Sequence, residues 1–91
     1  MQRPDLHVLA RFLAALARPG TSWTRARLQP AVRLNYDLFR RYLEFMAARG
    51  WIEEMAADDE PSPHLRLTPT GQAAHRELLA WLARWLDDAP G

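Results

Sequence analysis

Arginine is the side chain in this sequence best suited to binding a charged ligand, since all twelve basic residues are arginine. The net charge is only +1, but the charges are segregated along the chain. Residues 18–49 hold seven arginines against two acids, whereas residues 53–60 hold five acids and no basic residue. Guanidinium groups pair with phosphates and carboxylates. The first half of the chain is therefore a candidate anion-binding surface, with a plain solvated charged face as the alternative.

Other chemistries lack the residues they need. There is no cysteine, and the three histidines share no metal-ligand spacing, so neither a disulfide framework nor a metal site is expected. The glycines are scattered, which excludes a glycine-rich phosphate loop. Nothing places an acid or an oxyanion hole near Ser22 or Ser62, the two serines. We expect a protein that is not an enzyme and needs no cofactor.

Length and hydropathy limit the architecture. Ninety-one residues predict one domain over 1–91, and a chain of this size is often marginal alone, so dimerisation is expected. No run approaches the roughly 18 apolar residues of a membrane span. The amphipathic N-terminus is a poor signal peptide. With no cysteine, we expect a cytoplasmic protein without membrane contact.

One helix, predicted over 35–49, must position the central arginines. Asn35 is a good N-cap, and Gly50 suits the left-handed position that ends a helix. Apolar residues with helical spacing predict a core face made of Tyr36, Phe39, Leu43 and Met46. The opposite face then carries Asp37, Arg41 and Glu44, with Arg40 at its boundary.

A second apolar stripe lies beside this charged face and consists of Leu38 and Phe45, with Tyr42 as a further candidate. Exposed apolar clusters often mark protein contacts. We expect the stripe to pack on the first helix or on a dimer partner, with a surface for another protein as the alternative.

Three further elements surround this helix. Residues 4–17 predict a first helix, and residues 23–30, capped by Thr21 or Ser22, predict a short second helix that places Arg25, Arg27 and Arg33 in solvent. Residues 51–56 and 65–68 predict an antiparallel hairpin with an acidic loop, in which Arg66 points outward.

The last helix is predicted from the pair Thr68-Pro69, or from Thr70, to about Asp87. Its apolar surface is wider than one small core requires. We therefore predict a homodimer interface, with packing of both tryptophans on the first helix as the alternative; the interface residues are Leu78, Trp81, Leu82, Trp85 and Leu86.

The run YLEFMAARGWIE, a short hairpin and then LTPTGQAAHREL resemble the second half of winged-helix transcription regulators. The sequence is similar to the multiple-antibiotic-resistance (MarR) and PadR-type regulators, and most similar to small archaeal winged-helix proteins that dimerise through a C-terminal helix. The match covers about 31–79. It implies an α+β, mostly α fold, with a helix-turn-helix and wing over 4–67 and a C-terminal dimerisation helix over 68–88.

The resemblance also implies that helix 35–49 enters the DNA major groove. Arg41 is the expected base contact, and Arg25, Arg27 and Arg40 suit phosphates. The acidic wing tip 57–60 departs from the pattern and should point away from DNA. The full set of expected DNA-binding residues is Arg25, Arg27, Arg33, Asn35, Tyr36, Asp37, Arg40, Arg41, Glu44 and Arg66.

Two functions compete. The first is a homodimeric regulator that binds double-stranded DNA, for which about three phosphate contacts per copy predict a log–log salt slope near −5. The second is a winged-helix protein-interaction module without DNA binding, favoured by the low net charge and the acidic wing. Trp81 and Trp85 could line a small-molecule pocket, but the sequence does not identify an effector.

Overall fold

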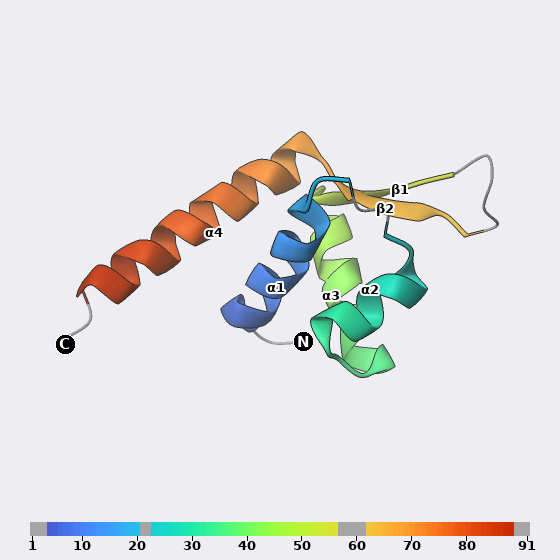
Figure 1. Cartoon of the computed structure of the whole chain (residues 1–91), viewed down its shortest axis with the longest axis horizontal. Helices are drawn as coiled ribbons and strands as arrows, with labels where there is room; N and C mark the ends of the chain where they lie inside the picture. Colours follow the sequence, from blue (N-terminus) through green and yellow to red (C-terminus); the bar gives the residue numbers. More distant parts are fainter. Residues whose placement is uncertain (1–3, 21–22, 57–61, 89–91) are drawn as a thin grey trace.

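The computed structural model describes residues 4–20, 23–56 and 62–88, with side chains through Trp85. Three helices form the body of the molecule, a two-stranded sheet extends from one side, and the last helix extends from the other (Figure 1). The molecule measures 50 × 26 × 22 Å. The elements in chain order are α1 (Leu6–Ala17), α2 (Arg25–Val32), α3 (Tyr36–Ala48), β1 (Ile52–Met55), β2 (His64–Leu67) and α4 (Pro69–Asp88).

The core lies where α1, α2 and α3 meet the inner face of the sheet. Phe12 is fully buried at its centre, with its ring stacked at 5.7 Å from those of both Phe39 and Tyr42. Leu28 and Val32 of α2 are also completely buried. The core therefore fixes the inward face of α3, and it confirms the inward positions predicted for Phe39, Leu43 and Met46.

Both predicted ends of α3 are confirmed. The Asn35 side chain accepts a hydrogen bond from the backbone N–H of Leu38 at 2.9 Å, as an N-cap should. Gly50 has φ 72°, and the N–H groups of Gly50 and Trp51 donate to the carbonyls of Ala47 and Met46, both at 3.0 Å. This pair of bonds is the Schellman arrangement, which satisfies the last carbonyls of the helix.

The prediction for Tyr36 was wrong, because its side chain is 63% exposed. At 100° per residue, Tyr36 lies to one side of the arc that contains Phe39 and Met46, and Tyr42 lies on the other edge of that arc. Tyr42 is buried, and its hydroxyl accepts a hydrogen bond from the backbone N–H of Asp5 at 2.8 Å. Tyr42 thus ties α3 to the start of α1 and does not belong to an exposed stripe.

The predicted start of the second helix was also wrong. Its cap is Thr24, whose side chain accepts a hydrogen bond from the N–H of Arg27, and the suggested caps Thr21 and Ser22 lie outside the described residues. Trp23 precedes the helix and forms a β-bridge with Leu65. The helix continues past Pro30 to Val32, although a proline inside a helix removes one backbone donor and disfavours the helix.

The sheet has the predicted hairpin topology, with Ile52 paired to Leu67 and Glu53 paired to Arg66. Ile52, Leu65 and Leu67 are buried, while Arg66 is exposed, as the period of two predicted. The tip that joins the two strands, residues 57–61, lies outside the described residues, so its predicted direction stays a prediction.

The start of α4 is fixed against the end of α3. Thr68 caps α4, since its hydroxyl accepts from the N–H of Gly71 at 3.0 Å, and its own N–H donates to the carbonyl of Trp51 at 2.9 Å. A Cβ at Gly71 would lie 2.0 Å from that same carbonyl oxygen, far inside contact distance. Only glycine fits this position, which gives a physical reason for the glycine in the LTPTG motif.

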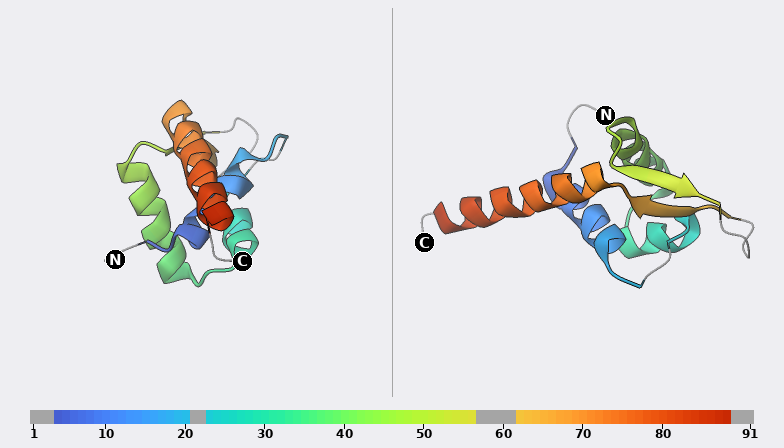
Figure 2. Two further views of the ribbon diagram at one scale, coloured as in Figure 1. Left: turned by 90° about the vertical axis from the view of Figure 1, so that its left-hand side faces the viewer. Right: turned by 90° about the horizontal axis from the view of Figure 1, so that it is seen from above.

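α4 is longer than α1, the helix on which it packs. α4 has 20 residues and α1 has 12, which corresponds to lengths of about 30 and 18 Å. Leu78 packs on the core, but Trp81 is 43% and Trp85 is 57% exposed. Figure 2 shows the C-terminal part of α4 projecting beyond the body. The alternative in which both tryptophans pack on α1 is therefore wrong.

We predict that Gly71→Ala destabilises the fold by about 2 kcal/mol or more, because the added methyl must displace the Trp51 carbonyl. In an ordinary helix the same change stabilises by about 1 kcal/mol. The control is Ala83→Gly at an exposed site on α4, which should cost about 1 kcal/mol. Urea unfolding measures both, and an increase in stability for Gly71→Ala would contradict the packing described.

Candidate nucleic-acid interface

The outward face of α3 is polar because the inward face is committed to the core. Tyr36, Asp37, Arg41 and Glu44 are exposed on this face, and Arg40 is half-buried at its edge. The predicted division of the helix into a core face and a charged face is therefore correct, apart from the position of Tyr36.

The charged side chains of this face are bound to one another. Arg40 donates to Glu44 at 2.7 Å and to Asp37 at 3.3 Å, one turn away on either side. Arg41 pairs with the second oxygen of Asp37 at 3.2 Å. The hydrogen bond and charge of Glu44, and then those of Asp37, raise the pKa of Arg40 above its ordinary value. Asp37 thus holds both arginines of α3.

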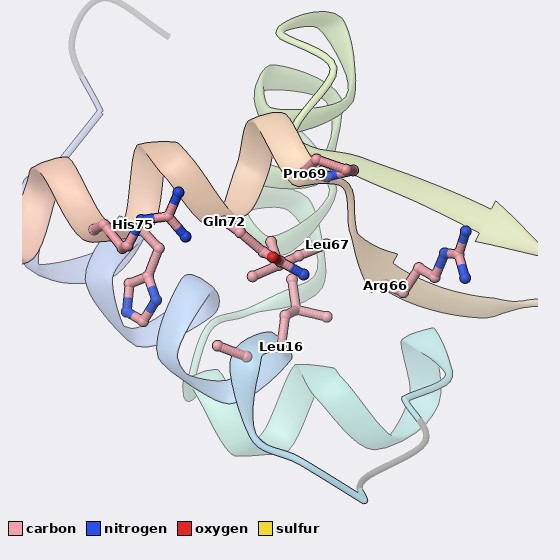
Figure 3. Close-up of a pocket in the computed structure, with 8 residues that line it drawn as sticks. Leu16, Arg66, Leu67, Pro69, Gln72 and His75 are labelled. Atoms are coloured by element: carbon pink, nitrogen blue, oxygen red, sulfur yellow. The ribbon is translucent and has the colours of Figure 1, made fainter.

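Two more ion pairs connect the wing, made of β1 and β2, to its surroundings. Arg25 at the start of α2 pairs with Glu54 of β1, and Arg66 of β2 donates to Glu53 across the hairpin at 2.5 Å. The side chain of Arg66 points along the wing, away from α4 (Figure 3).

A hollow of about 280 Å³ lies between α2, α3 and β1 and is lined by Arg25, Arg40, Glu44, Glu53 and Glu54. The structure thus brings predicted site residues of two helices, α2 and α3, to one surface beside the wing. Sequence reasoning missed Glu53 and Glu54. The signal for Glu53 was its place in a hairpin opposite an outward-facing arginine, since opposite charges pair across strands.

Arg27 and Arg33 differ from the other arginines of this region. Both are exposed, and neither forms an ion pair with any residue in the described part of the chain. Arg33 ends α2 in the left-handed conformation with φ 59°, at the turn into α3. Within the described residues, no carboxylate competes with an external anion for these two guanidinium groups.

The three residues of the apolar stripe have different surroundings, and Tyr42 packs on α1 as expected. Phe45 contacts Trp51 edge-on, with ring centroids 5.8 Å apart, and the guanidinium of Arg49 lies 4.0 Å from the centre of the Phe45 ring. Phe45 therefore packs on its own chain at the end of α3, and the predicted contact with a dimer partner stays a prediction. Of the stripe, Leu38 alone is exposed, at 38%.

Two larger hollows flank α4. One of about 590 Å³ lies between the end of α1, β2 and α4 and is bordered by Leu16, Leu67, Gln72 and His75 (Figure 3). Within it, the Nε2 atom of His75 is buried and has no hydrogen-bond partner among the described residues.

The other hollow, of about 760 Å³, is a mainly apolar groove between α1 and α4. It is lined by Leu13, Trp51 and Trp81, among others, but not by Trp85. Of the two tryptophans that could line a pocket, Trp81 borders this groove.

The described residues contain no group of three or more His, Asp or Glu side chains placed to hold a metal ion. None of the helices in the described part of the chain is long and apolar enough to cross a membrane.

Comparison with solved structures identifies the fold. The PcaV transcriptional regulator from Streptomyces coelicolor superposes with a TM-score of 0.73 at 22% identity, over 85% of this chain and 57% of that one. The MarR family transcriptional regulator SPO1453 from Silicibacter pomeroyi DSS-3 gives 0.66 at 24% identity, over 88% and 55%. The fold is a winged helix. The resemblance to MarR-type regulators is thus confirmed at the level of fold.

A third winged helix of similar structure is Sso10a-2, a DNA-binding protein from Sulfolobus solfataricus, with a TM-score of 0.72 at 13% identity. It matches over 93% of this chain and 84% of its own. The chain spans little more than half the length of the PcaV and SPO1453 structures. No model of a known protein family matches the sequence, and no curated protein matches it.

Proposed function

We propose that this winged helix is a double-stranded DNA-binding protein that regulates transcription as a homodimer. The observation that carries the proposal is the surface formed by α2, α3 and the wing, where an exposed polar helix face bears two arginines. The solved structures that share the fold are described as transcriptional regulators and as a DNA-binding protein, which supports a regulatory function over an enzymatic one.

In this proposal α3 enters the major groove with Arg41 near base edges, since a guanidinium can donate to guanine O6 and N7 together. Arg27 and Arg33 contact phosphates, because no carboxylate of the described chain competes for them. Asn35, Tyr36, Asp37 and Glu44 flank the groove, and the surrounding ion-paired arginines Arg25, Arg40 and Arg66 reach the DNA backbone.

The dimer is proposed to form through α4. Trp81 and Trp85 are both exposed on the C-terminal half of α4, and Leu82 is half-buried beside them. Leu78 packs on the chain's own core, so it serves the fold first. Leu86 lies on the same helix, but its side chain is outside the described residues. A two-fold pairing of α4 helices would bury these rings in both copies.

A protein-interaction module without DNA binding is the second candidate. It is favoured by the ion pairs on the α3 face, which leave little free positive charge there. The burial of Tyr42 and the packing of Phe45 on Trp51 remove most of the apolar stripe that first suggested it. It predicts that no DNA binding occurs even at low salt.

We predict that Arg40→Ala/Arg41→Ala weakens binding to a fluorescently labelled duplex and flattens the log–log salt slope by about 2 or more. The slope changes by about 0.9 for each phosphate that is no longer neutralised, and each dimer carries two copies of Arg40. Arg11→Ala/Arg76→Ala removes the same charge from α1 and α4 and is the control. Equal binding by the two double variants would contradict the proposed surface, provided that thermal melting shows both folded.

We predict that Trp81→Glu/Trp85→Glu converts the protein from a dimer to a monomer of 10.5 kDa in light scattering at micromolar concentration. The two charges would be buried at an apolar interface, which is strongly unfavourable. Leu79 is 49% exposed on the same helix, and Leu79→Ala, which keeps the helix apolar, tests whether the effect is specific to the tryptophans. A parent protein that is itself monomeric would contradict the dimer.

A further inference from the structure

Acids of the proposed DNA-binding surface pair with four of its six arginines. Four arginines of this surface are each bound to at least one carboxylate, and these acids also number four among the described residues: Asp37, Glu44, Glu53 and Glu54. All five of these ion pairs lie on the elements proposed to approach DNA. In a surface selected only for affinity to phosphate, these acids would be unfavourable.

The following inference rests on the proposed function. We propose that Asp37, Glu53 and Glu54 compete with DNA phosphates for the arginines of this surface and so determine sequence specificity. A carboxylate and a phosphate oxygen accept the same guanidinium hydrogen bonds. Each of the three acids holds a different arginine: Asp37 holds Arg41, Glu53 holds Arg66 and Glu54 holds Arg25.

The geometry of Asp37 supports a positioning role. Its two carboxylate oxygens bind two successive arginines, at 3.3 Å to Arg40 and 3.2 Å to Arg41. Asp37 also lies in the first turn of α3, where the helix dipole favours negative charge. The carboxylate holds Arg41 along the helix. DNA of random sequence can replace the Asp37–Arg41 pair mainly with phosphate contacts. A matching sequence adds the bidentate hydrogen bonds between Arg41 and a guanine.

Exposed ion pairs contribute little to stability, so DNA can displace them. The same weakness allows these ion pairs to discriminate between specific and non-specific DNA binding. Non-specific binding depends almost wholly on phosphate contacts, while specific binding adds base contacts. Competition for phosphate-binding arginines therefore lowers non-specific affinity proportionally more than specific affinity.

The test compares the parent with Asp37→Asn, with Glu53→Gln/Glu54→Gln and with the triple variant, by anisotropy on a mixed-sequence duplex over a range of salt. Asp37→Asn frees one arginine in each copy of the dimer, which should steepen the slope by about 2 and raise affinity several-fold. The triple variant frees three per copy, which should steepen the slope by about 5 and raise affinity at least tenfold.

The effect on sequence specificity is measured with a duplex that the parent protein selects from a randomised pool. The ratio of affinities for selected and mixed duplexes should fall by about tenfold in the triple variant, because non-specific binding gains more. Asp37→Asn should also melt at a slightly lower temperature, since it removes a favourable charge from the first turn of α3. A variant that is less stable but binds more tightly cannot be explained by a merely structural role.

Glu77→Gln is the matched control, because Glu77 is an exposed acid on α4 and its substitution makes the same change in net charge. If Glu77→Gln raises mixed-duplex affinity as much as Asp37→Asn does, net charge alone is responsible and the inference is overturned. The inference also fails if the triple variant keeps the parent's affinity and slope. If neither the parent nor the triple variant binds DNA at low salt, DNA binding itself is refuted.

Discussion

The backbone of Trp51 is the point on which the arrangement of the molecule depends. Its N–H closes the end of α3, and its carbonyl accepts the N–H of Thr68 at the start of α4. The same carbonyl lies where a side chain on Gly71 would be. Trp51 thus joins three elements: α3, which is proposed to contact DNA, the first strand of the wing, and α4, which is proposed to dimerise. Because these contacts are mostly backbone-mediated, the position of α3 relative to the start of α4 within one chain depends little on surface side chains.

Packing and ion pairing determine different properties of the proposed interface. Packing fixes which face of α3 is exposed, but ion pairs decide how much of the exposed charge is available. Arg27 and Arg33 are free of acids in the described chain, whereas Arg25, Arg40, Arg41 and Arg66 are not. A count of arginines therefore overstates the attraction to DNA.

Much of the fold could be predicted from the sequence because local signals agreed with one another. The cap at Asn35, the stop at Gly50 and the Thr68-Pro69 start all have short-range causes, and the structure confirms them. The errors arose where long-range contacts decided the outcome. Trp23 was drawn out of α2 by its bridge to Leu65, and Tyr42 was buried by α1.

The predicted site residues of α2 and α3 do meet at one surface beside β1, but the sequence alone did not reveal how their charges pair. The pairing of Arg25 with Glu54 joins residues 29 positions apart, so it depends on how α2 packs against the sheet. The hydrogen bond from Asp5 to Tyr42 has the same origin. Helical spacing, in contrast, already placed Asp37, Arg41 and Glu44 together on one face.

The most direct test of the account is the affinity of the unaltered protein for a mixed-sequence duplex, measured by anisotropy from about 50 to 300 mM salt, where phosphate contacts dominate. With Arg27, Arg33 and Arg40 of two copies engaging phosphates, the log–log slope should be about −5, with binding at about micromolar protein in the lowest salt. No change in anisotropy at about 50 mM salt, where phosphate binding is strongest, would contradict DNA binding by this surface.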